Sequence, residues 1–257
     1  IDIDPSELGR SYPNAVSLLG DAKTTLRRMI DIVQEKRDNK KWTERTQQLL
    51  REWRSETKPL WNSEAKPIRP ERLCREMSAV LPSDGILVSD TGFAGIWTGT
   101  MVDFNHSGQS YLRAAGSLGW AFPAALGVKC GAPERPVVAF IGDGGFYYHL
   151  SELETANRCG INIVTVINNN QYLRQCVEGI NQAYGDRSGN RDEQCKFTEI
   201  NFARIAEDMG CVGIRVEDPA DISAALKEAL SLHRPVVVDV ITDPACKAPS
   251  PWTPPKK

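Results

Sequence analysis

Short apolar runs alternate with amphipathic stretches from residue 67 onward. The apolar runs, which predict strands, lie at 86–88, 137–141, 161–167, 212–216 and 236–241. Stretches with apolar residues at helical spacing, which predict helices, lie at 70–80, 119–130, 149–159, 202–209 and 222–230. The strand runs are apolar without alternation, so we expect them to be buried on both faces. The pattern predicts an α/β fold, a parallel sheet with helices on both faces.

The N-terminal part of the chain has a different pattern. Ile1 and Ile3 alternate with polar residues as in a strand, and apolar positions between 26 and 33 share one helical face. Residues 34–68 are polar, and we expect a solvated connecting helix there. The alternative is that its tryptophans form a stripe that docks on a neighbouring surface. We expect the chain to divide into 1–33, a linker 34–68, a main domain 69–245 and a Pro-rich tail 246–257.

Composition and charge narrow the class of protein. Hydrophobic residues make up 41% and charged residues 25%, as in ordinary soluble domains. The net charge of −2 favours neither nucleic acid nor an anionic membrane as partner, and no apolar run could span a bilayer. The chain opens without a basic and apolar leader, and its seven cysteines include no CxxC pair. We therefore expect reduced thiols and a cytoplasmic protein.

Polar clusters follow two of the predicted strands. The run ending at Ile141 continues as GDGG, and the run ending at Ile167 continues as NNNQ. Asp143 and Asn170 would offer two oxygen ligands at the carboxyl edge of the sheet, where open α/β sheets bind ligands. Mg²⁺ accepts such a set when phosphate oxygens and water complete the shell. The glycines flanking Asp143 would let backbone N–H groups approach a phosphate.

The segment GDGGFYYHLSELETANRCGINIVTVINNNQ resembles the diphosphate-binding signature of thiamine diphosphate enzymes of the acetolactate synthase and benzoylformate decarboxylase type. The resemblance implies thiamine diphosphate and Mg²⁺ as cofactors. The implied metal ligands are Asp143, Asn170 and the backbone carbonyl of Tyr172. The implied contacts to the cofactor are Asp90, Thr91, Gly92, Phe93, Gly116, Ser117, Leu118, Gly142, Asp143, Gly144, Gly145, Asn170, Tyr172 and Leu173.

Leu118 lies in AAGSLGWAFPAALGVK, which matches a further segment of that family. The resemblance gives it a catalytic role, as the bulky side chain that forces the cofactor into a bent conformation. The bend brings the 4′-amino group to the thiazolium C2 proton, which is a positional effect. The alternative for Leu118 is an ordinary place in the core.

One part of the family's site has no counterpart in this chain. The family uses a Glu from a separate pyrimidine-binding domain to start formation of the carbanion, and nothing in the 257 residues replaces it. We therefore expect half a site, completed by a pyrimidine-binding domain or subunit in a dimer or tetramer. Residues 1–33 resemble the end of the family's central domain. FAD is possible by that resemblance, although this chain does not support it.

The substrate side follows the implied metal ligands. Gln175 and Cys176 are predicted to act on the substrate side, at the start of a helix that points into the pocket. Acetohydroxyacid synthases carry a Trp where Gly179 stands, and pyruvate decarboxylases a Glu where Cys176 stands. We expect a 2-keto acid substrate, decarboxylated with carboligation. The alternatives are a simple decarboxylase or C–C lyase, and a non-catalytic cofactor-binding subunit.

Overall fold

The computed structural model describes residues 1–33, 39–185, 187–250 and 253. The chain divides into two compact units, Ile1–Glu52 and Trp53–Lys257. Parts of the predicted linker and of the Pro-rich tail, residues 34–38, 251–252 and 254–257, lie outside the described residues.

The first unit contains little regular structure. Helix α1 spans Ala22–Ile32 and begins at Asp21, whose side chain accepts a hydrogen bond from the Thr24 amide. The strand predicted at Ile1–Ile3 is wrong, because the structure has only a single bridge between Asp2 and Leu19 there. Two alternating residues offer too few ladder hydrogen bonds to make a strand.

Helix α2 (Lys40–Trp61) confirms the helix expected in the linker, and from Trp53 it belongs to the second unit. Trp42 is 74% exposed, as a solvated helix requires. Trp53 and Trp61 instead pack against the core of the second unit, with their rings edge to face at 5.7 Å. The solvated-helix prediction is therefore wrong for the C-terminal turns of α2, where the alternative of a docking stripe is confirmed.

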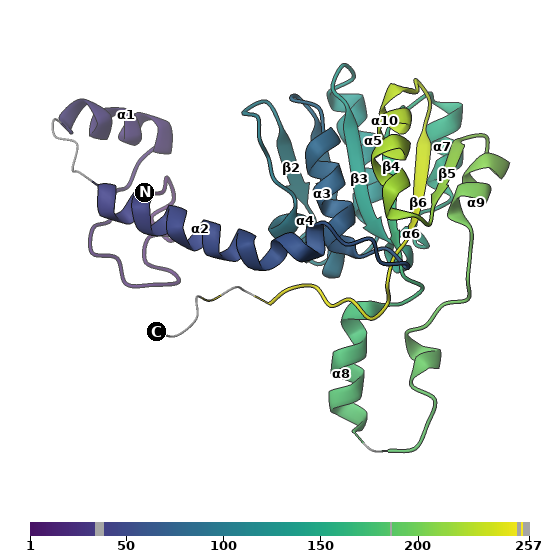
Figure 1. Cartoon of the computed structure of the whole chain (residues 1–257). Helices are drawn as coiled ribbons and strands as arrows, with labels where there is room; N and C mark the ends of the chain where they lie inside the picture. The colour runs from purple at the N-terminus through teal and green to yellow at the C-terminus, as the bar shows by residue number, and fades with distance from the viewer. Residues whose placement is uncertain (34–38, 186, 251–252, 254–257) are drawn as a thin grey trace. The chain divides into compact units, whose positions relative to one another are not determined.

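The second unit is built on one parallel sheet (Figure 1). Its strands are ordered β2-β1-β3-β4-β6-β5, and every neighbouring pair is parallel. The strands are β1 (Ile86–Ser89), β2 (Ser110–Arg113), β3 (Val137–Gly142), β4 (Val164–Asn169), β5 (Val212–Val216) and β6 (Val236–Ile241). The prediction of a parallel α/β sheet is confirmed.

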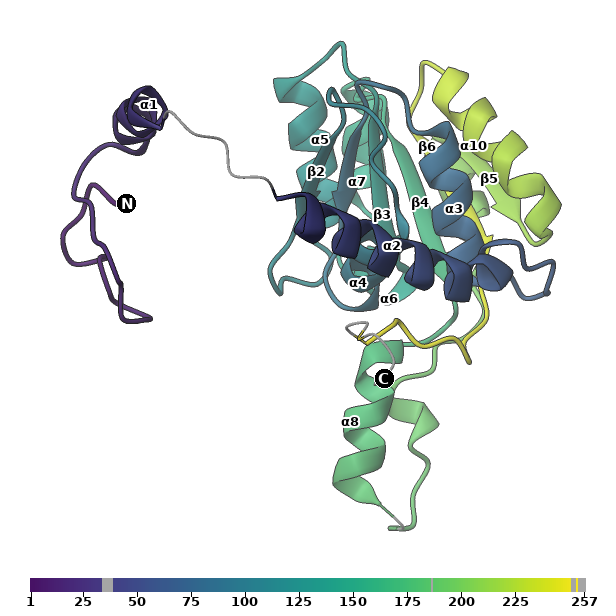
Figure 2. The ribbon, with the colours of Figure 1, turned by 60° about the vertical axis from the view of Figure 1, so that its left-hand side comes forward.

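Helices cover both faces of this sheet (Figures 1 and 2). One face packs against α3 (Pro70–Val80), α4 (Phe93–Met101) and α10 (Ile222–Ser231). The other packs against α5 (Ala121–Gly131), α6 (Asp143–Phe146), α7 (Glu152–Arg158) and α9 (Phe202–Asp208). Short 3-10 turns lie at η1 (Asp192–Gln194) and η2 (Pro219–Asp221). The central strands are buried except at the last residue of β3 and of β6, as their uninterrupted apolar runs predict.

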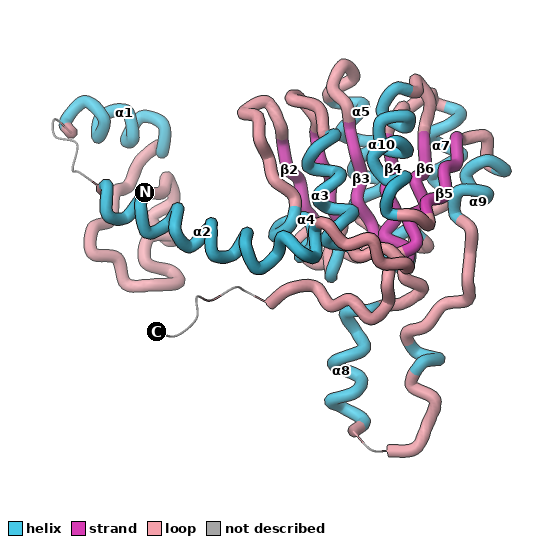
Figure 3. Tube along the Cα trace, in the orientation of Figure 1, coloured by secondary structure: helices cyan, strands magenta, loops and turns pink. Residues whose placement is uncertain are grey.

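Two features of the topology position the site. The chain leaves β1 toward β2 on one side and continues with β3 on the other, so the connections diverge between β1 and β3. Such a switch point opens a crevice beyond the carboxyl ends of the strands. In addition, a long excursion of residues 170–201, here called the arm, leaves the sheet after β4 and carries α8 (Arg174–Tyr184), as Figure 3 shows.

Candidate active site

A pocket of about 340 Å³ lies at the carboxyl edge of the sheet. The predicted site residues that line it are Thr91, Gly92, Phe93, Gly116, Leu118, Gly142, Asp143, Gly144, Gly145, Asn170, Tyr172, Leu173, Gln175 and Cys176. Segments separated by more than 80 positions in the sequence thus meet in one place, as the resemblance implied. Ala94, Asn168 and Arg174, which were not predicted, complete the lining.

Unsatisfied oxygens mark the centre of this pocket. Asp143 is 2% exposed, and its Oδ1 accepts a hydrogen bond from the Gly144 amide at 2.7 Å. Its Oδ2 is buried and accepts no hydrogen bond from a described residue, and the same holds for Oδ1 of Asn168. Buried polar atoms are nearly always paired, so two orphans in one pocket indicate a missing cationic or hydrogen-bonding partner.

Electrostatics agree with that interpretation. Burial raises the pKa of Asp143 to about 7, against the opposing effect of backbone N–H groups, that of Gly144 first and then those of residues 170–172. A carboxylate held in so poorly solvated a place is expensive unless a cation neutralises it. Asn170 contributes a further oxygen, although its Oδ1 already accepts from the Tyr172 amide at 3.1 Å.

The two glycines that follow Asp143 lie where a side chain would collide with neighbouring residues. A Cβ on Gly144 would lie 2.5 Å from Leu173 Cδ2, and a Cβ on Gly145 would overlap Oδ2 of Asp90. Glycine therefore lets the backbone of this turn approach both the arm and the end of β1. The backbone of Gly144 and Gly145 lines the pocket, and it is called the glycine shelf below.

Asp90 and Ser117 do not line the pocket. Asp90 is fully buried, and its carboxylate accepts from the amides of Gly119 at 2.9 Å and Ala121 at 3.4 Å. It fixes the turn that carries Leu118. Ser117 is exposed, and its carbonyl accepts from the Trp120 amide. The direct cofactor contacts of these two residues stay predictions.

Other parts of the site differ from, or add to, the sequence expectation. Phe93 begins helix α4, an element for which the sequence pattern predicted neither helix nor strand. The helix expected after the implied metal ligands is confirmed as α8, which begins at Arg174. The prediction that it points into the pocket holds only for its first turn, because no residue of α8 beyond Cys176 lines the pocket. Gln171 adopts a left-handed φ of 60°, unusual for a residue other than glycine, at the turn between the implied ligands. Asn168 could have been noticed as the first residue of NNNQ.

The cysteines and histidines suggest no nucleophilic site. All seven cysteines are free thiols, and Cys176 is exposed at the pocket. None of the three histidines lines that pocket. The described residues contain no cluster of three or more His, Cys, Asp and Glu side chains that could hold a metal. A metal in this pocket would therefore depend on side-chain amide oxygens, backbone carbonyl oxygens and oxygens of a bound molecule, in addition to the carboxylate of Asp143.

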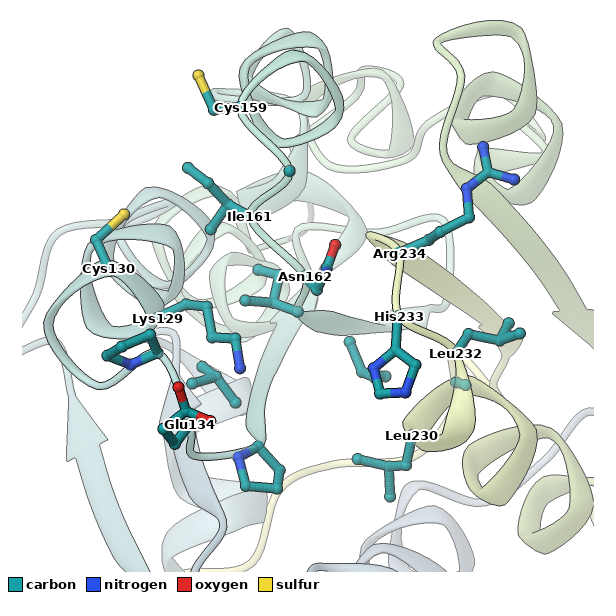
Figure 4. A pocket seen from close by; sticks show the side chains of 17 residues that line it. Lys129, Cys130, Glu134, Cys159, Ile161, Asn162, Leu230, Leu232, His233 and Arg234 are labelled. Carbon is teal, nitrogen blue, oxygen red and sulfur yellow. The ribbon is translucent and has the colours of Figure 1, made fainter.

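A second pocket, of about 500 Å³, lies at the opposite, amino edge of the sheet (Figure 4). Lys129 and His233 face it from different elements, and Glu134 lies beside Lys129. The Lys129 ammonium donates to the Arg135 carbonyl at 2.9 Å. No predicted site residue lines this pocket, and no buried unpaired polar atom of the described residues belongs to it.

The fold is an α/β domain with a pocket at a topological switch point, the place where open α/β sheets bind ligands. Residues 90–240 match the family model described as thiamine pyrophosphate enzyme, C-terminal TPP binding domain. The chain belongs to this family. The resemblance stated from the sequence is thereby confirmed.

Relatives cover nearly the whole chain. It is 31% identical over 257 residues to a probable acetolactate synthase large subunit of Methanocaldococcus jannaschii, covering 95% of this chain and 42% of that protein. It is 31% identical over 262 residues to glyoxylate carboligase of Escherichia coli O157:H7, covering 95% of this chain and 43% of that protein. The chain thus spans less than half the length of these relatives.

A solved structure has the same fold. The thiamine diphosphate-dependent 4-hydroxybenzoylformate decarboxylase of Rhodococcus jostii RHA1 superposes with a TM-score of 0.62 at 28% identity, covering 70% of this chain and 34% of that one. Among the described residues, no helix combines the length and apolar character needed to cross a membrane.

Proposed function

We propose that this chain supplies the diphosphate- and Mg²⁺-holding half of a thiamine diphosphate site that decarboxylates a 2-keto acid and ligates the product to an acceptor. The observation that carries the proposal is the pair of unpaired oxygens, on Asp143 and Asn168, beside the glycine shelf. Membership of the thiamine pyrophosphate enzyme family supports it.

The residues of the pocket fit a metal-bound diphosphate. Mg²⁺ would be held by the carboxylate of Asp143, the amide oxygen of Asn170 and the carbonyl of Tyr172, all of which are oxygen donors. Gly144 and Gly145 would present backbone N–H groups to the phosphates, as would the first turn of α4 after Gly92. The remaining metal positions would be filled by phosphate and water.

The chain's own residues would orient and shield the reacting end. When bound, thiamine diphosphate supplies an electron sink for the decarboxylation. Leu118 is half-buried on the pocket wall, and there it would support the bent form of the cofactor. Gln175 and Cys176, in the first turn of α8, would line the substrate side and exclude water.

The other half of the site would come from a pyrimidine-binding domain that supplies the activating Glu. The chain spans 42% of a probable acetolactate synthase large subunit, which leaves room for such a domain elsewhere in a longer protein or in a partner subunit. We propose an assembly of two or four copies in the cytoplasm. Residues 1–33 are proposed as the end of a central domain, 34–68 as the linker, 69–245 as the cofactor domain and 246–257 as a tail. FAD stays possible without support from this chain.

A simple 2-keto acid decarboxylase or C–C lyase is the second candidate. It is favoured by the likeness to the solved 4-hydroxybenzoylformate decarboxylase. A non-catalytic cofactor-binding subunit is a third, and the buried Asp143 in the pocket speaks against it, because an unpaired carboxylate is costly to keep without use.

Product analysis on the full-length protein tests the proposal. We expect Mg²⁺- and thiamine diphosphate-dependent release of CO₂ from a panel of 2-keto acids, with a larger ligated product when an acceptor aldehyde or keto acid is present. Decarboxylation to a free aldehyde only, whatever the acceptor, would favour the second candidate. No turnover combined with tight cofactor binding would favour the third, and no cofactor binding at all would refute the proposal.

The separate 257-residue chain provides the control for the missing half. It should bind cofactor weakly and show no measurable decarboxylation, because no residue is available to activate the aminopyrimidine. Robust turnover by this chain free of any other polypeptide would contradict the half-site.

A further inference from the structure

The arm, residues 170–201, extends from the carboxyl edge of the sheet (Figures 1 and 3). Its first segment, residues 170–173, and its last, residues 195–201, connect it to the sheet and are called its two stems. The stems pair with each other, since the Leu173 amide donates to the Cys195 carbonyl at 2.8 Å and the Phe197 amide to the Gln171 carbonyl at 2.7 Å. The first stem carries pocket residues from Asn170 onward. The shape of the pocket therefore depends on the position of the two points where the arm joins the sheet, here called its roots.

One buried carboxylate holds both roots. Asp239, in β6, is fully buried. Its Oδ1 accepts a hydrogen bond from Nδ2 of Asn169 at 2.9 Å, and its Oδ2 accepts from the Phe202 amide at 3.0 Å. Asn169 lies directly before the arm and Phe202 directly after it. Nδ2 of Asn169 also donates to the carbonyl of Ile200 at 3.3 Å, which links the two roots to each other.

This carboxylate is placed at a cost. The flanking β6 residues Val237, Val238 and Val240 are fully buried and apolar. Arg215 compensates the charge only partly, because its Nη1 is 3.4 Å from Oδ2 of Asp239 and the same guanidinium also pairs with two glutamates. An apolar residue of similar volume would avoid the desolvation of the carboxylate. The carboxylate offsets this cost by fixing the geometry of the arm, which an apolar residue could not do.

The strand places this contact directly behind the proposed metal site. Asn168 lines the pocket and Asn169 does not, as the alternation of side chains along β4 requires. A displacement of Asn169 therefore moves the backbone that presents Asn168, Asn170 and the Tyr172 carbonyl.

We propose that Asp239 is a positioning residue, which acts through Asn169 and Phe202 to hold the arm where Asn170 and Tyr172 can bind the metal. The metal part of this inference rests on the proposed function. The positioning of the arm does not.

The test compares Asp239→Asn with Val237→Ala in the full-length protein. The two contacts of Asp239 that hold the arm come from the N–H donors of Asn169 and Phe202, so an asparagine amide can accept from one and must turn its own NH₂ toward the other. Val237 lies on the same strand and face, is equally buried, and touches the core rather than the arm. Its truncation reproduces a loss of stability without loss of the contact.

Two readouts separate positioning from stability. At saturating thiamine diphosphate, we expect Asp239→Asn to raise the Mg²⁺ concentration at which metal binding is half-saturated at least tenfold. This lies within the roughly 10–100-fold effect typical of groups that orient metal ligands. Amide hydrogen exchange at Leu173 and Phe197 should also accelerate in the metal-free protein. Val237→Ala should lower Tm and leave both readouts within twofold of wild type.

The outcomes decide the matter in each case. If Asp239→Asn changes Tm but leaves Mg²⁺ half-saturation and both exchange rates as in Val237→Ala, the positioning role is overturned. If Asp239→Asn does not fold, Asn169→Ala, which spares the Phe202 and Arg215 contacts, takes its place with the same expectations. If wild type binds neither Mg²⁺ nor the cofactor, the proposed function fails, and the exchange rates at Leu173 and Phe197 alone support or overturn the positioning.

Discussion

The two pockets at opposite edges of one sheet differ in whether their polar groups have hydrogen-bond partners. The amino-edge pocket is the larger, at about 500 Å³ against about 340 Å³. Its Lys129 has an acceptor, and its Arg234 donates to the Gly210 carbonyl at 2.8 Å. The carboxyl-edge pocket holds buried oxygens on Asp143 and Asn168 without a partner. Unmet hydrogen-bonding capacity, rather than volume, distinguishes the site from a surface hollow.

The largest expected effect comes from removing the unpaired carboxylate. Asp143→Ala should weaken Mg²⁺-dependent thiamine diphosphate binding by more than about 100-fold, beyond the usual cost of losing an orienting group. The fold should survive, because the substitution removes a poorly solvated buried carboxylate. Calorimetry on the full-length protein checks this, with Glu134→Ala at the amino-edge pocket as control. Equal affinity in Asp143→Ala and Glu134→Ala would remove the metal assignment.

Truncating one leucine in each pocket compares the effect of the two pockets on kcat. If the side chain holds the cofactor bent, its truncation should lower kcat about 100-fold, as expected for a small misplacement of reacting groups. Leu232→Ala, which truncates a half-buried leucine of the amino-edge pocket, should leave kcat unchanged. Steady-state turnover of a 2-keto acid measures both. A kcat within twofold of wild type in Leu118→Ala would assign this leucine to the core alone.

Gly145→Ala tests the glycine shelf. The added methyl would overlap Asp90 and lie 3.0 Å from Ile141 Cγ1, so we expect a loss of about 1–3 kcal/mol of stability from overpacking. Cofactor affinity should fall with it. Gly131→Ala, at the end of α5, adds a methyl with nothing within 4 Å and should be nearly neutral. Denaturant unfolding of both variants gives the difference, and similar values would contradict a tightly packed shelf.

The smallest effect is expected at Gly179. This residue is exposed on α8 and does not line the pocket, and a Cβ there would meet nothing within 4 Å. Because Gly179 lies outside the pocket lining, Gly179→Trp should shift the preference between 2-keto acids by less than about tenfold, below the effect of a group on the pocket wall. Competition between pairs of substrates measures this. An unchanged ranking together with a collapse of cofactor affinity would show that the substrate side was placed wrongly.

The sequence was most informative where one segment carries its own signal. Uninterrupted apolar runs predicted the buried strands, and GDGG and NNNQ marked the two strand ends that meet. Strand β2 escaped prediction because Ser110–Arg113 is a partly exposed edge strand with no apolar run. The left-handed φ of Gln171 has no signal in residue type. Asp239 could not be recognised, because its partner Asn169 lies 70 positions away.

The manner in which the arm is attached has a consequence for how such a protein diversifies. Its anchoring contacts lie at the two stems, at Asp239 and at the start of α8, where Arg174 donates to the Pro244 carbonyl and Glu178 pairs with Lys247. The rest of α8 contains no buried residue. We therefore expect insertions, deletions or exchanged sequence within 179–190 to leave the sheet and the glycine shelf unchanged. A chimera that grafts this stretch from a relative would inherit new surroundings for the substrate while keeping the host's scaffold.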